Sequence, residues 1–243
     1  MPLHILIPAA IALILIVVVI RIYPILHIQM AKLLFGKYSS AYLATYKRYT
    51  GQSPYAYCIK DDFINHIAGF YKKANSLIEF NSGLEITFLD TAYGSTFKKV
   101  HKNNKKQMCV NANRLREFDL KVLGYRDIMF TAEMKKYFFF ANGRFFLGEL
   151  TFKNPSENNI RQIIAVIAKK YLNGKIPESD TFLIHGSNKA SLLCTNNGFH
   201  LKISYLNHGI EEVNSQIEAY WTSATQKIFQ ETPSLETELM ERL

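Results

Sequence analysis

The sequence predicts an α+β domain that follows a single membrane-spanning helix. Every residue from Ile5 to Ile20 is apolar. Many later segments alternate apolar and polar residues, as half-buried strands do, and longer stretches repeat apolar residues at helical spacing. We therefore expect an N-terminal transmembrane helix and then a mainly antiparallel sheet flanked by helices.

Length and composition bound the domain count. The chain has 243 residues, of which 48% are hydrophobic, enough for one domain with a real core. The formal charge of +9 favours an anionic contact, such as a membrane surface, a nucleic acid or an acidic partner. Three widely spaced cysteines without a CxxC pair indicate a reducing compartment.

The apolar run is about as long as a helix that crosses the hydrocarbon of a bilayer. A cleaved signal peptide is the alternative, but the basic start and the small-residue cleavage pattern of such peptides are missing. We expect residues 1–23 to remain as an anchor. The side chains expected in lipid are Ile5, Leu6, Ile7, Ile11, Leu13, Ile14, Leu15, Ile16, Val17, Val18, Val19 and Ile20.

Basic residues near a span indicate its orientation, because they are retained on the cytoplasmic side. No Lys or Arg precedes the span, and five follow it closely. We therefore expect a short outer N-terminus and a cytoplasmic domain. The five cations are Arg21, Lys32, Lys37, Lys47 and Arg48.

Pro24 is expected to bend or break the first helix. Residues 24–51 then predict a second, amphipathic helix, which lies in the headgroup region or connects to the domain. The domain proper is expected over residues 52–243, as one body or as two lobes, 52–135 and 136–243.

In the first half of the domain, residues 61–80 predict a helix, and residues 84–88 alternate like a strand. Further strands are expected at 108–112, 118–123 and 127–131.

The clearest local signal is Asn142-Gly143, which is typical of a tight hairpin turn, between strands 137–141 and 144–152. A helix with apolar residues from Ile160 to Tyr171 follows. Strands are then expected at 181–185, 189–195 and 199–206, with a last helix after Gly209. This β-β-α-β-β-β-α order resembles that of longin-like and profilin-like sandwiches, which are mostly binding scaffolds.

A dense group of cations is expected in a polar loop. It consists of Lys98, Lys99, His101, Lys102, Lys105 and Lys106. Such a loop suits anionic lipid or an acidic protein partner. A solvated hairpin tip is the plain alternative. Nucleic acid is less favoured, because the loop lacks Arg and offers no exposed aromatic ring beyond Phe97.

Three other groups could carry chemistry, and for each we favour a structural role. Asp90, Glu149 and Lys153 could be assembled into a nuclease-like metal site, although Glu149 on a sheet is more often a surface residue. Asp180, His185 and Ser187 lie close in sequence, but Ser187 belongs to a turn and not to a nucleophile elbow. The spacing of Cys194, His200 and His208 matches no zinc pattern.

No phosphate-binding glycine loop, dinucleotide fingerprint or HExxH motif occurs. We therefore expect no cofactor and no metal. The aromatic run 137–140 with Phe145 and Phe146 predicts core packing on both faces of a sheet, with a partner-binding patch as the alternative.

The leading hypothesis is a membrane-anchored adaptor or assembly subunit that binds a protein partner and is not an enzyme. The rival hypothesis is a membrane-tethered hydrolase or nucleic-acid-processing enzyme whose site is assembled from distant residues. A ligand-sensing domain is a third hypothesis, which sequence does not separate from these two.

Overall fold

The computed structural model describes residues 3–55, 58, 77–104, 107–114, 119–129, 131–211, 213–216, 218–219 and 222. The chain divides into two compact units, Met1–Tyr57 and Cys58–Leu243. We call them the anchor unit and the sheet domain.

The anchor unit is a helical hairpin. Helix α1 (Leu3–Phe35) passes through Pro24 without a break, so the predicted break at Pro24 is wrong. The helix ends at Gly36, whose φ of 82° is easily adopted only by glycine. Ser39 then caps α2 (Ser40–Thr50), and its hydroxyl accepts a hydrogen bond from the amide of Tyr42. The expected amphipathic helix over 24–51 is thus divided between the end of α1 and α2.

Within α1, Leu15–Phe35 is long and apolar enough to cross a membrane, with a mean hydropathy of 1.6. Its apolar side chains from Leu15 to Ile20 are between 43% and 65% exposed. A helix that is apolar and uncovered on this scale is the type that lipid surrounds.

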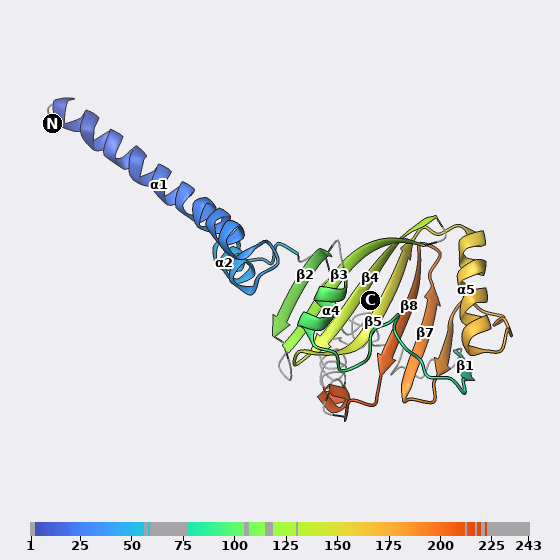
Figure 1. Cartoon of the computed structure of the whole chain (residues 1–243). Coiled ribbons are helices and arrows are strands. Elements are labelled where there is room, and N and C mark those ends of the chain that lie inside the picture. The colour runs from blue at the N-terminus through green and yellow to red at the C-terminus, as the bar shows by residue number, and fades with distance from the viewer. Residues whose placement is uncertain are drawn as a thin grey trace, which may run out of the picture. The chain divides into compact units, whose positions relative to one another are not determined.

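The sheet domain is built on one mixed sheet of eight strands in the order β1-β6-β7-β8-β5-β4-β3-β2 (Figure 1). Only β1 and β6 pair in parallel, and the other described pairs are antiparallel. The α+β class predicted from the sequence is therefore confirmed. The strands are β1 (Ile78–Asn81), β2 (Gln107–Arg114), β3 (Asp119–Met129), β4 (Ala132–Ala141), β5 (Arg144–Lys153), β6 (Phe182–His185), β7 (Ala190–Asn196) and β8 (His200–Asn207).

The predicted hairpin is confirmed. Strands β4 and β5 meet at Asn142 and Gly143, which have the positive φ values of 48° and 79° that this turn requires. The two separate strands expected over 118–131 are one long strand, β3, because its pairing with β4 continues without interruption.

Two expectations between residues 61 and 91 are wrong where the structure describes them. The predicted helix lies mostly outside the described residues, but its end is strand β1. The predicted strand 84–88 is an extended segment outside the sheet, although Ile86 and Phe88 are fully buried. The side chain of Asn188 replaces a neighbouring strand there: it accepts from the amide of Ile86 at 3.1 Å and donates to the carbonyl of Ile86 at 3.0 Å.

Aromatic side chains fill the core on both faces of the sheet, as predicted. On the first face, Phe138 lies 5.0 Å from the ring of Phe88. On the second face, Phe139 and Phe146 belong to a cluster with Leu206 and Val213. Val213 belongs to the predicted last helix, of which residues 211, 213–216, 218–219 and 222 are described and helical.

Helix α5 (Glu157–Tyr171) begins at Ser156, which caps the helix by accepting from the amide of Asn159. It buries Ile163, Ile164, Ile167, Ala168 and Tyr171. The predicted helix and its apolar stripe are confirmed, with a start two residues after Pro155.

Cys58 and Cys109 form a disulfide with their Cα atoms 6.0 Å apart. This pairing differs from the three unpaired cysteines that the sequence suggested. The separation of 51 residues carries no local signal, so only the fold brings the two together. Cys109 lies on β2, and Gly124 of the adjacent strand leaves room for its sulfur atom.

Candidate functional site

The predicted group of cations lies on a helix and not in a loop. Helix α4 (Phe97–Asn103) begins at Thr96, whose hydroxyl accepts from the amide of Lys99. Val100 is 2% exposed, and the ring of Phe97 lies 5.4 Å from that of Phe140. The apolar residues of α4 therefore fasten it to the sheet. Figure 1 shows the helix lying in front of the strands.

The charged residues of α4 point away from this contact. Lys98, Lys99, His101 and Lys102 are exposed, and Lys105 and Lys106 lie outside the described residues. Lys121 on β3 adds a further cation, with its Nζ 5.9 Å from the centre of the Phe97 ring. No acidic residue occurs between Asp90 and Glu117, so no neighbour in sequence neutralises the cations of α4. We call Lys98, Lys99, Lys102 and Lys121 the α4 basic surface.

Glu149 on β5 was expected at the surface, but it is buried. Its side chain is only 2% exposed. Thr151 donates its hydroxyl to Oε1 at 3.0 Å, and Nζ of Lys202 lies 3.5 Å from Oε2. Burial of a carboxylate is tolerated when hydrogen bonds and a cation compensate the lost hydration. The contacts of Glu149 with Thr151 and Lys202 therefore have a structural role, because they link strands β5 and β8.

The nuclease-like site is not formed. Phe88, two residues before Asp90, packs against Gly148, and it therefore lies on the opposite face of the sheet from Glu149. Lys153 is exposed, and the cation beside Glu149 is Lys202. Within the described residues, no group of three His, Cys, Asp or Glu could hold a metal ion.

His185 has partners that the sequence did not indicate. Its Nδ1 lies 3.1 Å from the hydroxyl of Ser191, and its Nε2 lies 3.4 Å from a carboxylate oxygen of Glu79. Ser187 has no part in this chain, and Asp180 instead accepts from the side-chain amide of Asn196. The structure therefore does not form an Asp180, His185 and Ser187 group, and Ser187 lies in a turn, the role favoured from the sequence.

The order Glu79, His185, Ser191 is that of an acid, a base and a nucleophile. However, Ser191 is only 3% exposed, so a substrate cannot reach its hydroxyl in this conformation. The three residues come from β1, β6 and β7, and their hydrogen bonds join three neighbouring strands. Sequence reasoning missed this group because Glu79 precedes His185 by more than a hundred residues.

Cys194, His200 and His208 do not form a site. Cys194 is fully buried opposite Ile203, and burial, with Asp180 nearby, raises the pKa of its thiol to about 12. His200 lies opposite Lys153. Burial lowers the pKa of His208, and nearby His185 lowers it further, against a hydrogen bond with Asn214.

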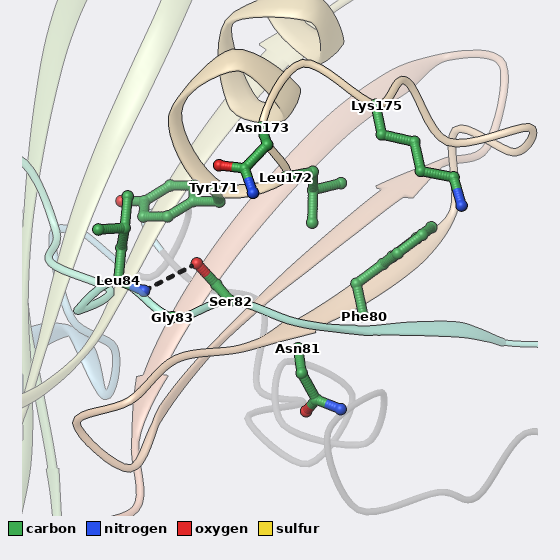
Figure 2. A pocket seen from close by; sticks show the side chains of 9 residues that line it. All are labelled: Phe80, Asn81, Ser82, Gly83, Leu84, Tyr171, Leu172, Asn173 and Lys175. Atoms are coloured by element: carbon green, nitrogen blue, oxygen red, sulfur yellow. Dashed lines mark hydrogen bonds between the residues drawn. The ribbon is translucent and has the colours of Figure 1, made fainter.

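A pocket of about 360 Å³ opens between β1 and the end of α5. Figure 2 shows the rings of Phe80 and Tyr171 and the side chain of Leu172 on its walls, with Lys175 at one side. The hydroxyl of Ser82 is used within the wall, where it accepts from the amide of Leu84. The volume is in the range of small-ligand pockets, about 300–1,000 Å³. This pocket was not predicted from the sequence, because the segment that contains Phe80 was expected to be a helix. The other lining residues are Asn81, Gly83 and Asn173.

Comparison with known proteins identifies no relative: no family model, no curated protein and no solved structure matches the chain. The class defined by fold and site is therefore an α+β domain with an N-terminal helix suited to a membrane and a helix-borne basic surface.

Proposed function

We propose that this protein is a membrane-anchored adaptor whose sheet domain binds an acidic protein partner through the α4 basic surface. The observation that carries the proposal is the placement of these cations on a rigid element. Phe97 and Val100 fix α4 to the sheet, so little backbone freedom is lost when the cations meet a carboxylate-rich surface. Complementary charge also speeds the encounter of two proteins.

The proposal includes a cytoplasmic sheet domain. Five cations follow the span and none precedes it. Basic residues beside a span are retained on the cytoplasmic side when the helix inserts into the membrane. The Cys58–Cys109 pair favours the opposite side, because disulfides persist in oxidising compartments. We give more weight to the charges, since two buried neighbouring cysteines in a reducing compartment remain as thiols.

Charge reversal on the α4 basic surface tests the adaptor function. Full-length protein carrying Lys98→Glu, Lys99→Glu and Lys102→Glu is compared with wild type for partners captured by crosslinking in cells and identified by mass spectrometry. We expect the crosslinked partner to be lost and its domain or segment to be acidic.

A matched control carries the same change of charge elsewhere. Lys153, Lys169 and Lys175 are exposed on β5, α5 and the segment after α5, and their replacement by Glu should leave the crosslinks intact. Equal loss in both variants, or a partner that the α4 variant still captures, contradicts the proposal.

The rival function is a hydrolase, which the Glu79–His185–Ser191 chain of hydrogen bonds favours. A fluorophosphonate probe tests it, because the probe labels an activated serine covalently. Labelling of wild type that Ser191→Ala and His185→Gln both abolish would establish the rival. We expect no labelling of Ser191, because its side chain is buried.

A further inference from the structure

The end of α2 returns to the middle of α1. The ring of Tyr49 lies 6.3 Å from that of Tyr23 and 5.6 Å from that of His27. Tyr42 and Ala31 are buried where the two helices pack. The turns of α1 that follow Tyr23 therefore have α2 beside them.

This packing limits where hydrocarbon can surround α1. Helix α2 carries Lys47 and Arg48, both exposed, and charged side chains are excluded from the bilayer centre. Residues Leu3 to Ile22 precede the part of α1 that has α2 on one side, and at about 1.5 Å per residue they rise about 30 Å, the thickness of the hydrocarbon core. The bilayer surface thus falls close to Tyr23, and tyrosines are enriched at this level.

Three cations lie within two residues of Tyr23 or Tyr49, whose rings are in contact. Arg21 lies on α1 just before Tyr23, and Lys47 and Arg48 are brought there by the fold of the hairpin next to Tyr49. All three are exposed, and the first 60 residues of the chain contain no Asp or Glu. Nothing in this part of the sequence neutralises the cluster.

We propose that Arg21, Lys47 and Arg48 form a binding site for the phosphate of an anionic phospholipid headgroup. Guanidinium groups bind phosphate oxygens in pairs, and an ammonium adds a point charge. The inference rests on the membrane anchoring included in the proposed function and is independent of the partner of α4. Lipid bound at this site holds the hairpin at the bilayer surface through the C-terminal end of α2.

Native mass spectrometry of the full-length protein tests the site. The protein is released from micelles that contain equal amounts of phosphatidylglycerol and phosphatidylcholine, and the retained lipids are counted. Wild type is expected to retain phosphatidylglycerol preferentially. Lys47→Gln with Arg48→Gln should reduce this preference roughly thirtyfold, the loss expected for two cations near anionic lipid.

The matched control is Lys32→Gln with Lys37→Gln, because these two exposed cations flank the turn at the other end of the hairpin. It removes the same charge and should keep the preference. Inorganic phosphate added during the preparation should not displace the lipid. The inference is overturned by an unchanged preference in the Lys47 and Arg48 variant, by equal losses in both variants, or by displacement with phosphate.

The triple charge reversal on α4 separates the two proposals. It should abolish partner capture and leave the lipid preference unchanged. Loss of lipid preference in that variant would show that lipid binds the α4 basic surface and would overturn the assignment to Arg21, Lys47 and Arg48.

Discussion

At the scale of single residues, the buried carboxylate of Glu149 is compensated by Lys202, which belongs to the neighbouring strand β8. The strand of Glu149 follows from alternation, but no local pattern places Lys202 beside it and not Lys153. The partners of His185 were missed for the same reason, since they belong to strands that neighbour its own strand only in the folded sheet. Contacts between residues far apart in sequence leave no periodic signal.

Gly148 is required by a close contact with an aromatic ring. A Cβ at this position would lie 2.2 Å from the ring of Phe88, which is fully buried and cannot move aside. We expect Gly148→Ala to lower the free energy of unfolding by about 1–3 kcal/mol, as overpacking does. Urea unfolding of the full-length protein in detergent measures it. Gly83→Ala is the control, because nothing lies within 4 Å of its Cβ, and an equal effect of both variants would contradict the argument.

His208 makes stability depend on pH. Burial lowers its pKa, and His185 lowers it further, while Asn214 and Glu218 raise it. When the folded pKa is below the unfolded value of about 6.5, the unfolded chain binds more protons as the pH falls through that value. The stability that His208 contributes is therefore fully present above the unfolded pKa, and it is lost as the pH falls through the lower, folded pKa.

The melting temperature of the wild type should fall from pH 7.5 to pH 5.5 more than that of His208→Gln. Other histidines are common to both proteins, so the difference between the two pH profiles isolates His208. Parallel profiles would show that His208 titrates alike in the folded and unfolded chains.

At the scale of elements, the sequence predicts what local rules determine. The Asn142-Gly143 hairpin, helix α5 and strands β6 to β8 occur where turn residues and periodicity place them. β1 was missed because it is a short edge strand that pairs in parallel with β6, far along the chain. The segment 84–88 has the alternation of a strand, but Ile86 at its centre bonds to the side chain of Asn188 and not to a neighbouring strand.

Asn188→Ala tests that side-chain contact. The substitution leaves the amide and the carbonyl of Ile86 without their partner, and each unsatisfied buried group costs about 1–3 kcal/mol. We expect the free energy of unfolding to fall by at least about 1 kcal/mol in urea. Asn197→Ala, which removes only contacts inside the β7–β8 turn, should cost less. A smaller effect for Asn188→Ala would mean that water satisfies Ile86 in its absence.

At the scale of the whole molecule, the anchor and the charge behind it were visible in sequence, but the cysteine pairing was not. The disulfide joins Cys58, at the start of the sheet domain, to strand β2 near the edge of the sheet. Closing a loop across 51 residues stabilises a domain by about 4 kcal/mol in the chain-entropy model. Whether the bond is closed in the cell depends on the side of the membrane on which the domain lies.

Counting thiols determines that side. In purified, air-exposed protein, maleimide should label no cysteine in the folded state, because the high pKa and burial of Cys194 keep it unreactive and the other two are bonded. Denaturation without reductant should expose one thiol, that of Cys194. In cells trapped with acid and then denatured, a cytoplasmic domain should show three labelled cysteines, since the reducing poise keeps Cys58 and Cys109 as thiols. One label from trapped cells would place the sheet domain in an oxidising compartment and overturn the orientation that the five cations favour.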